Sequence, residues 1–198
     1  MASLFEQLKD LGNGAVRATV APLIAAMRAE QALLGSSRGD AVFQSYSQIM
    51  SLVPGVQGEY VRRAFYALSL PRCGRDFTVG FGTVFSKQQV EVGDRVYIGM
   101  HCTIGNVVLE DHVTIGSNVD ILSGTAQHNF DDPDVPIQDQ GGSFVTIRIG
   151  ANSWLGNGTI VMADIGPGCI VGAGSVVVKP LSDRVIAAGN PARVIRER

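Results

Sequence analysis

Aliphatic residues recur with a period of about six along the last two thirds of the chain, and many are followed directly by glycine. Nine such pairs occur: Val79-Gly80, Val92-Gly93, Ile98-Gly99, Ile104-Gly105, Ile115-Gly116, Ile149-Gly150, Leu155-Gly156, Ile165-Gly166 and Val171-Gly172. Most residues two positions before an inward aliphatic are small or β-branched, and they include Val96, Cys102, Val113, Val119, Ser153, Thr159, Cys169 and Ser175. Residues two apart on a strand share a face, so each repeat sends one large and one small side chain inward and turns at glycine. Three such sides predict a triangular parallel β-helix with about eighteen residues per coil.

The repeat breaks off between Leu122 and Thr146. The aliphatic step from Ile121 to Ile149 is 28 residues, which is not a multiple of six. The intervening segment, 123–146, is polar and interrupted by proline and glycine. A long loop that leaves a rigid scaffold is commonly functional, so we expect a protruding loop that carries chemistry.

Residues 1–72 lack the repeat and predict helices. The segment 15–34 is alanine-rich with helical spacing and stops at Gly35, and Asp40 is placed to cap a second helix through Val53. A third helix is expected from Gly58 to Leu70. The sequence therefore predicts an N-terminal helical extension, 1–72, followed by a β-helix domain, 73–198, that ends in a short tail, 189–198.

Two interpretations of the extension remain open. It can cover one open end of the β-helix, because such an end exposes strand edges. Alternatively Arg62 and Arg63 belong to a basic amphipathic surface that makes a peripheral membrane contact.

Composition narrows the classes of partner. Charged residues make up 17% of the 198 residues and the net charge is −2, which argues against nucleic acid. The N-terminus lacks the basic-then-apolar layout of a secretory signal, and the longest apolar stretch, 18–27, is too short to span a membrane. No CxxC pair occurs, and Cys102 and Cys169 fall at inward positions. A reducing, cytoplasmic compartment is expected.

Three histidines are present. His101 and His112 lie at turns on different corners of the predicted triangle, whereas His128 lies in the loop. A catalytic zinc site such as that of the γ-class carbonic anhydrases needs three converging ligands, which this spacing does not predict. We therefore expect no metal, and His128 is the candidate catalytic residue.

At this point the chain resembles the hexapeptide-repeat acyltransferases, and within them the maltose/galactoside and xenobiotic O-acetyltransferase branch. The resemblance covers about residues 73–198 and rests on the repeats, the one-histidine loop and three segments: 149–158, 171–180 and 188–196. It implies a left-handed parallel β-helix and a homotrimer with its active sites between neighbouring subunits. It also implies acetyl-CoA, or another acyl-CoA, as the co-substrate.

The resemblance carries roles to individual residues. It implies that His128 is catalytic and that six residues contact CoA: Trp154, Gly156, Asn157, Ala173, Lys179 and Arg193. Asp131, Asp132 and His101 are further candidates for binding the acceptor, and the two aspartates could also orient the imidazole. Plainer interpretations stay open, since Trp154 could fill space between subunits and Lys179 and Arg193 could be solvated surface charges.

The chemistry of these residue types agrees with the resemblance. A neutral imidazole with a pKa of about 6.5 suits a general base for an attacking hydroxyl, and a backbone N–H at a glycine turn could stabilise the oxyanion. The predicted activity is O-acetylation of a sugar or polysaccharide precursor. N-acylation of an amino sugar and a non-catalytic scaffold are the alternatives. One departure concerns Gly99, which stands where sugar-acetylating members usually have an asparagine, so a maltose-like or galactoside-like acceptor pocket is in doubt.

Overall fold

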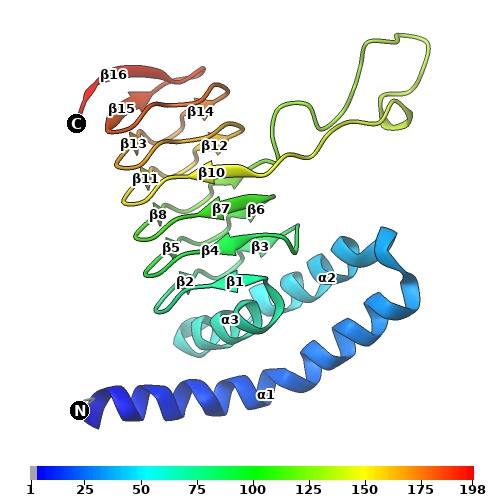
Figure 1. The fold of residues 1–198 in the computed structure, drawn as a ribbon, viewed down its shortest axis with the longest axis vertical. Coiled ribbons are helices and arrows are strands. Elements are labelled where there is room, and N and C mark those ends of the chain that lie inside the picture. The colour runs from blue at the N-terminus through cyan, green and yellow to red at the C-terminus, as the bar shows by residue number, and fades with distance from the viewer. Residues whose placement is uncertain (1–3) are drawn as a thin grey trace.

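The computed structural model describes residues 4–198, with side chains from Gly14 onward. The argument about a secretory signal rests partly on residues 1–3, which lie outside the described residues. Figure 1 shows a three-sided solenoid with helices across one end and one long loop projecting from its side.

The solenoid has three faces, which we call A, B and C in the order in which the chain passes through them. Face A contains β1 (Arg72–Cys73), β4 (Glu91–Val92), β7 (Val107–Leu109) and β10 (Ile147–Ile149). Face B contains β2 (Thr78–Val79), β5 (Tyr97–Ile98), β8 (Thr114–Ile115), β11 (Trp154–Leu155), β13 (Ile170–Val171), β15 (Val185–Ala188) and β16 (Arg193–Glu197). Face C contains β3 (Val84–Phe85), β6 (Thr103–Ile104), β9 (Asp120–Ile121), β12 (Ile160–Val161) and β14 (Val176–Val177). All strands pair in parallel except β15 and β16, whose antiparallel pair forms the C-terminal tail.

The inward positions match those read from the repeat. The pairs Ile98↔Ile115 and Ile104↔Ile121 stack the large side chains of successive coils, and these side chains are buried. The small inward residues are buried as well, including Cys102 and Cys169. Thr159 and Ser175, though polar, do not cost stability there, because each hydroxyl donates to a turn carbonyl.

The glycines that follow the strands are required by the stacking of coils. A Cβ atom at Gly99 would lie 2.6 Å from the carbonyl carbon of Gly116 in the next coil. A Cβ atom at Gly156 would lie 2.5 Å from the backbone nitrogen of Ala173. Each turn therefore lies directly against the backbone of the next, and even a methyl group would push the coils apart.

The helical extension consists of α1 (Leu4–Leu34), α2 (Gly39–Ser51) and α3 (Gly55–Ser69). The first helix begins earlier than expected and ends, as expected, before Gly35, whose φ is 81°. The prediction that Asp40 caps the second helix is wrong: Arg38 is the N-cap residue, and no side chain caps it. Asp40 lies in the first turn, where its carboxylate accepts hydrogen bonds from Lys87 Nζ and from the backbone N–H of Gln88.

The extension covers the open end of the first coil. Arg62 Nε donates to the carbonyl of Val79 at 2.8 Å, and Ser47 Oγ accepts the backbone N–H of Phe85 at 2.9 Å. These bonds pair the free edges of β2 and β3, so the capping interpretation is confirmed.

Arg62 does not belong to a surface that could face a membrane, because it is 1% exposed and its Nη1 donates to the carbonyl of Val53. Arg63 lies over the ring of Tyr60 at 4.9 Å. Among the described residues, no helix combines the length and apolarity that crossing a membrane requires.

Candidate active site

The loop that interrupts the repeat leaves face C after β9 and returns to face A at β10, so it projects from the C–A corner (Figure 1). Its outgoing and returning arms are joined by backbone hydrogen bonds. The N–H of Ser143 donates to Ala126 at 2.7 Å, and the N–H of Asn129 donates to Gly141 at 2.9 Å. The loop is thus a paired ribbon over most of its length, which gives its side chains defined positions.

The tip of the loop is closed by Gln140. Its Nε2 donates to the carbonyls of Asp132 and Val135, both at 2.7 Å, and its Oε1 accepts the N–H of Asp132 at 3.1 Å. A short 3₁₀ turn, Ile137–Asp139, completes the tip. Sequence reasoning missed Gln140, because a polar residue in a polar loop carries no pattern that marks it.

His128 lies where the paired arms meet the tip. Its side chain is exposed, and together with Pro136, Ile137 and Gln138 it lines a cavity of about 400 Å³. No hydrogen bond or ion pair engages the imidazole within the described chain, so its nitrogens are available to a ligand.

Gly142 faces the backbone of His128 across the ribbon. A Cβ atom at Gly142 would lie 2.0 Å from the carbonyl oxygen of Gln127 and 2.9 Å from the backbone nitrogen of His128. The close approach of the two arms at the candidate base therefore requires glycine at this position. Gly142 was not among the predicted site residues, although the Gly141-Gly142 pair is a visible signal in the sequence.

Asp131 and Asp132 follow His128 in the chain but do not bond to its ring. Asp132 Oδ1 accepts the N–H of Asp134 at 3.0 Å, which makes it part of the tip structure. Asp131 is exposed. An orienting role for either carboxylate stays a prediction that no contact within the described chain supports.

Three of the predicted CoA contacts are exposed on face B or at the B–C corner. Trp154 points outward from β11 and is 52% exposed, and Asn157 and Ala173 are exposed at the corner. Asn157 Oδ1 accepts the N–H of Ser117 at 3.0 Å, which ties its side chain to the neighbouring turn. Gly156 is buried beneath this corner, so it shapes the surface through its missing side chain.

Three other predicted residues lie apart from this group in the solenoid. Lys179 is exposed at the C–A corner, the corner from which the loop projects, and lies two coils beyond the roots of the loop. Arg193 is exposed at the start of β16. His101 lies at the B–C corner near the helical end, where its ring meets that of Phe81 edge-on at 5.6 Å.

The site residues are therefore divided between two parts of one chain. His128 and Lys179 belong to the loop and the C–A corner, whereas Trp154, Asn157 and Ala173 belong to face B and the B–C corner. Figure 1 shows the loop projecting away from the solenoid, so a single chain does not enclose a ligand between His128 and Trp154.

The other reactive groups do not assemble into a site. His112 lies at the A–B corner, 3.3 Å from Arg95 Nη2, so the three histidines occupy three different places. Over the described residues, no group of three or more His, Cys, Asp or Glu side chains is placed to hold a metal. Burial raises the pKa of the Cys73 thiol to about 12, and it raises that of Cys102 as well, so neither is poised as a thiolate nucleophile.

Comparisons with known proteins agree with this architecture. The hexapeptide repeat of succinyl-transferase matches residues 89–123 and 146–179. The galactoside O-acetyltransferase of Escherichia coli is 33% identical over 127 residues, which is 63% of this chain and 52% of that protein. The chain spans about half the length of the curated relatives it matches.

Two solved structures share the fold. A maltose O-acetyltransferase from Clostridium difficile 630 matches with a TM-score of 0.69 and 23% identity over 80% of this chain and 87% of that one. A hexapeptide-repeat acetyltransferase from Vibrio cholerae, complexed with acetyl coenzyme A, matches with a TM-score of 0.68 and 21% identity over 82% and 90%.

The chain thus carries the hexapeptide repeat of succinyl-transferase over residues 89–123 and 146–179, and it shares its fold with solved hexapeptide-repeat acetyltransferases. The expected architecture, a left-handed parallel β-helix with a helical extension and a protruding loop, is confirmed. Over the matched region, the chain is similar to the galactoside O-acetyltransferases of Escherichia coli and Lactococcus lactis, at 33% and 34% identity.

Proposed function

We propose that the protein is a CoA-dependent O-acetyltransferase that transfers acetyl from acetyl-CoA to a hydroxyl of a sugar or polysaccharide precursor. The observation that carries this proposal is the isolated imidazole of His128, which is exposed on a hydrogen-bonded ribbon and faces a cavity of about 400 Å³. Relatives with this repeat are named as galactoside and maltose O-acetyltransferases.

The surface near Trp154 fits a long, thin co-substrate. The exposed indole, Asn157 and Ala173 lie along consecutive coils, and the glycines of the corner leave room for a narrow chain. Lys179 and Arg193 are exposed and make no ion pair within the described chain, so they suit the phosphates of CoA. The solved structure from Vibrio cholerae holds acetyl coenzyme A on the same fold.

His128 acts as the general base in this proposal. Its neutral imidazole accepts the proton of the acceptor hydroxyl as that oxygen attacks, and returns the proton to the departing thiolate. The thioester supplies the acetyl group. Such a base contributes about 10²–10⁴ in rate. Because burial raises the pKa of the Cys73 and Cys102 thiols, neither suits an acyl-cysteine intermediate, and we propose direct transfer from the thioester to the acceptor.

The assembly we propose is a homotrimer in which His128 of one subunit faces the Trp154 surface of the next. The division of the site residues between two corners supports this arrangement, because one chain does not bring them together. We also propose a cytoplasmic location, which suits the three free cysteines.

The acceptor pocket we propose is not maltose-like. A Cβ atom at Gly99 would lie 2.6 Å from the backbone of Gly116, so an asparagine does not fit there without moving the coil. His101 at the same corner is a candidate acceptor contact in its place.

The test is an acceptor panel of sugar hydroxyls and amino sugars, with release of CoA thiol as the readout. We expect turnover of hydroxyl acceptors and a loss of about 10²–10⁴ in kcat for His128→Ala. Preferred turnover of amines would favour the N-acyltransferase alternative, and unchanged turnover by His128→Ala would refute the base assignment.

Mixed assemblies test the shared site. Chains with His128→Ala and chains with Trp154→Ala are each expected to have low activity alone. When they are unfolded and refolded together, a site shared between subunits restores part of the activity, because some interfaces then carry neither substitution. Mixtures that stay as inactive as the two separate variants would place the site within one chain.

A further inference from the structure

Lys87 connects the helical extension to the loop that carries His128. It lies between β3 and β4, at the C–A corner of the first coil, below the roots of the loop. Its Nζ lies 3.1 Å from Asp40 Oδ2 on α2 and 4.7 Å from the centroid of the Phe144 ring on the returning arm. One ammonium group therefore contacts two elements that are far apart in sequence.

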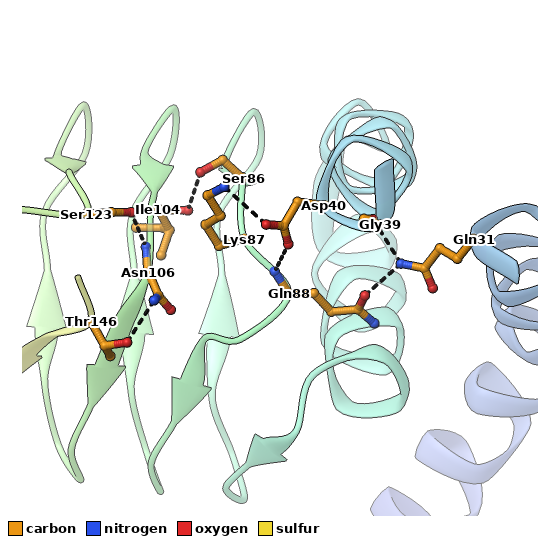
Figure 2. Close-up of polar contacts among 10 residues, drawn as sticks. All are labelled: Gln31, Gly39, Asp40, Ser86, Lys87, Gln88, Ile104, Asn106, Ser123 and Thr146. Atoms are coloured by element: carbon orange, nitrogen blue, oxygen red, sulfur yellow. Dashed lines mark hydrogen bonds and ion pairs between the residues drawn. The ribbon is translucent and has the colours of Figure 1, made fainter. Parts of the chain in front are cut away.

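The corner that carries Lys87 is anchored to all three helices, and Figure 2 shows its contacts with α1 and α2. Asp40 on α2 accepts the backbone N–H of Gln88 at 3.2 Å. Gln31 on α1 donates to Gln88 Oε1 at 2.7 Å, and Gln88 Nε2 donates to the carbonyl of Ser69 on α3 at 2.9 Å. The Lys87 side chain is thus held on a rigid base.

The returning arm is fixed to the solenoid next to Phe144 as well. Asn106, one coil above Lys87, donates from Nδ2 to Thr146 Oγ1 at 2.7 Å and from its backbone N–H to Ser123 Oγ at 2.8 Å (Figure 2). The N–H of Val145 donates to the carbonyl of Ser123 at 3.0 Å. These bonds hold both roots of the loop, while Lys87 holds the arm at the first residue beyond them.

Phe144 lies on the same arm of the ribbon as the residue that packs against His128. Phe144 is two residues from Gly142, which lies against the backbone of Gln127 and His128. Phe144 is 51% exposed, and its contact with Lys87 restrains the direction of its ring. A cation over an aromatic ring at an exposed site contributes about two- to fivefold to the equilibrium between held and released arms.

We propose that Lys87 is a positioning residue. Its cation–π contact with Phe144 holds the returning arm and thereby sets the position of His128 on the loop. The helical extension then acts as the anchor of the catalytic loop as well as a cover for the first coil. This inference rests on the proposed role of His128 for its kinetic consequence, but the restraint of the loop is independent of any activity.

The test compares four single variants and one double variant of the full chain. Lys87→Met removes the charge and keeps the side-chain length, Phe144→Leu removes the ring, and Lys87→Arg retains the cation. Arg72→Met is the matched control, because it also removes a cation of the first coil that pairs with a carboxylate, at 3.8 Å from Glu91, but it does not contact Phe144.

Hydrogen exchange of the Asn129 and Ser143 amides reports the pairing of the arms. We expect exchange about two- to fivefold faster in Lys87→Met and Phe144→Leu, wild-type rates in Arg72→Met, and recovery in Lys87→Arg. The double variant Lys87→Met/Phe144→Leu should exchange no faster than either single variant. Wild-type exchange rates in both single variants would show that the Lys87–Phe144 contact does not restrain the loop.

Kinetics test the second half of the inference. We expect Lys87→Met to lower kcat while the KM for acetyl-CoA stays unchanged, because the CoA surface does not involve the loop root. Faster exchange with an unchanged kcat would overturn the positioning role. If the wild-type chain turned over no acceptor, the proposed function would fail, yet the exchange rates would still decide whether Lys87 holds the loop.

Discussion

Replacing Gly142 by alanine should displace His128 without unfolding the protein. The added Cβ atom would lie 2.0 Å from the carbonyl oxygen of Gln127, whereas real contacts of this kind stay beyond 3.0 Å. The two arms of the ribbon must therefore separate by at least about 1 Å at the candidate base. A misplacement of that size costs about 10² in rate when a catalytic group must meet its substrate in a defined geometry.

The assay is kcat at saturating acetyl-CoA, with CoA affinity and thermal unfolding measured in parallel. We expect kcat to fall about a hundredfold, while CoA affinity and the unfolding midpoint stay near wild type, since the loop lies outside the core. Gly141→Ala is the control: it sits at φ 76° with nothing within 4 Å of the added atom, so it strains one residue without a clash. A Gly142→Ala enzyme with wild-type kcat would refute the idea that the paired arms position His128.

Three further predictions concern the solenoid and its cover. Arg62→Met leaves the buried carbonyl of Val79 without its donor and should lower the free energy of unfolding by about 1–3 kcal/mol in denaturant titration; a stable variant would show that water replaces the guanidinium. Burial raises the folded-state pKa of Cys73 from 9.0 to about 12. The contribution of this thiol to the free energy of unfolding is therefore complete below pH 9 and is lost as pH rises towards 12. The free energy of unfolding should fall by roughly 1 kcal/mol between pH 9 and pH 10, and an undiminished slope in Cys73→Ala would assign the loss to other groups. Gly99→Asn should destabilise the fold by about 1–3 kcal/mol through its clash with Gly116, and a gain of maltose acetylation by a stable variant would contradict our view of that corner.

The solenoid was predictable because its interior repeats one local rule. Every inward position faces the same environment, so large residues such as Ile98 and small ones such as Ser153 recur at fixed steps, and irregular steps such as Val161 to Ile165 still end on buried residues. The placement of His101 and His112 at turns on different corners followed from the same steps.

The rest depended on contacts between distant segments, which periodicity does not encode. Asp40 looked like a helix cap because only its neighbours were considered, but its carboxylate meets Lys87, 47 residues away. Arg62 looked like part of a basic surface. It is buried instead, because its guanidinium donates to the carbonyl of Val79 at the otherwise unpaired edge of the first coil. The arms of the loop pair through backbone hydrogen bonds, Gln140 closes the tip through its side chain, and Gly142 allows the arms to approach closely; a polar sequence without alternation reveals none of these contacts.

The stacking of the coils also fixes the distance between corners along the solenoid. Lys179 stands two coils beyond the roots of the loop, and neighbouring parallel strands lie about 4.8 Å apart, so this separation can change only in whole-coil increments. Inserting one extra coil after β12 would move Lys179 by a single increment while every turn kept its shape. Adding or removing whole coils can therefore adapt a solenoid of this kind to a longer or shorter ligand, while each face keeps its sequence.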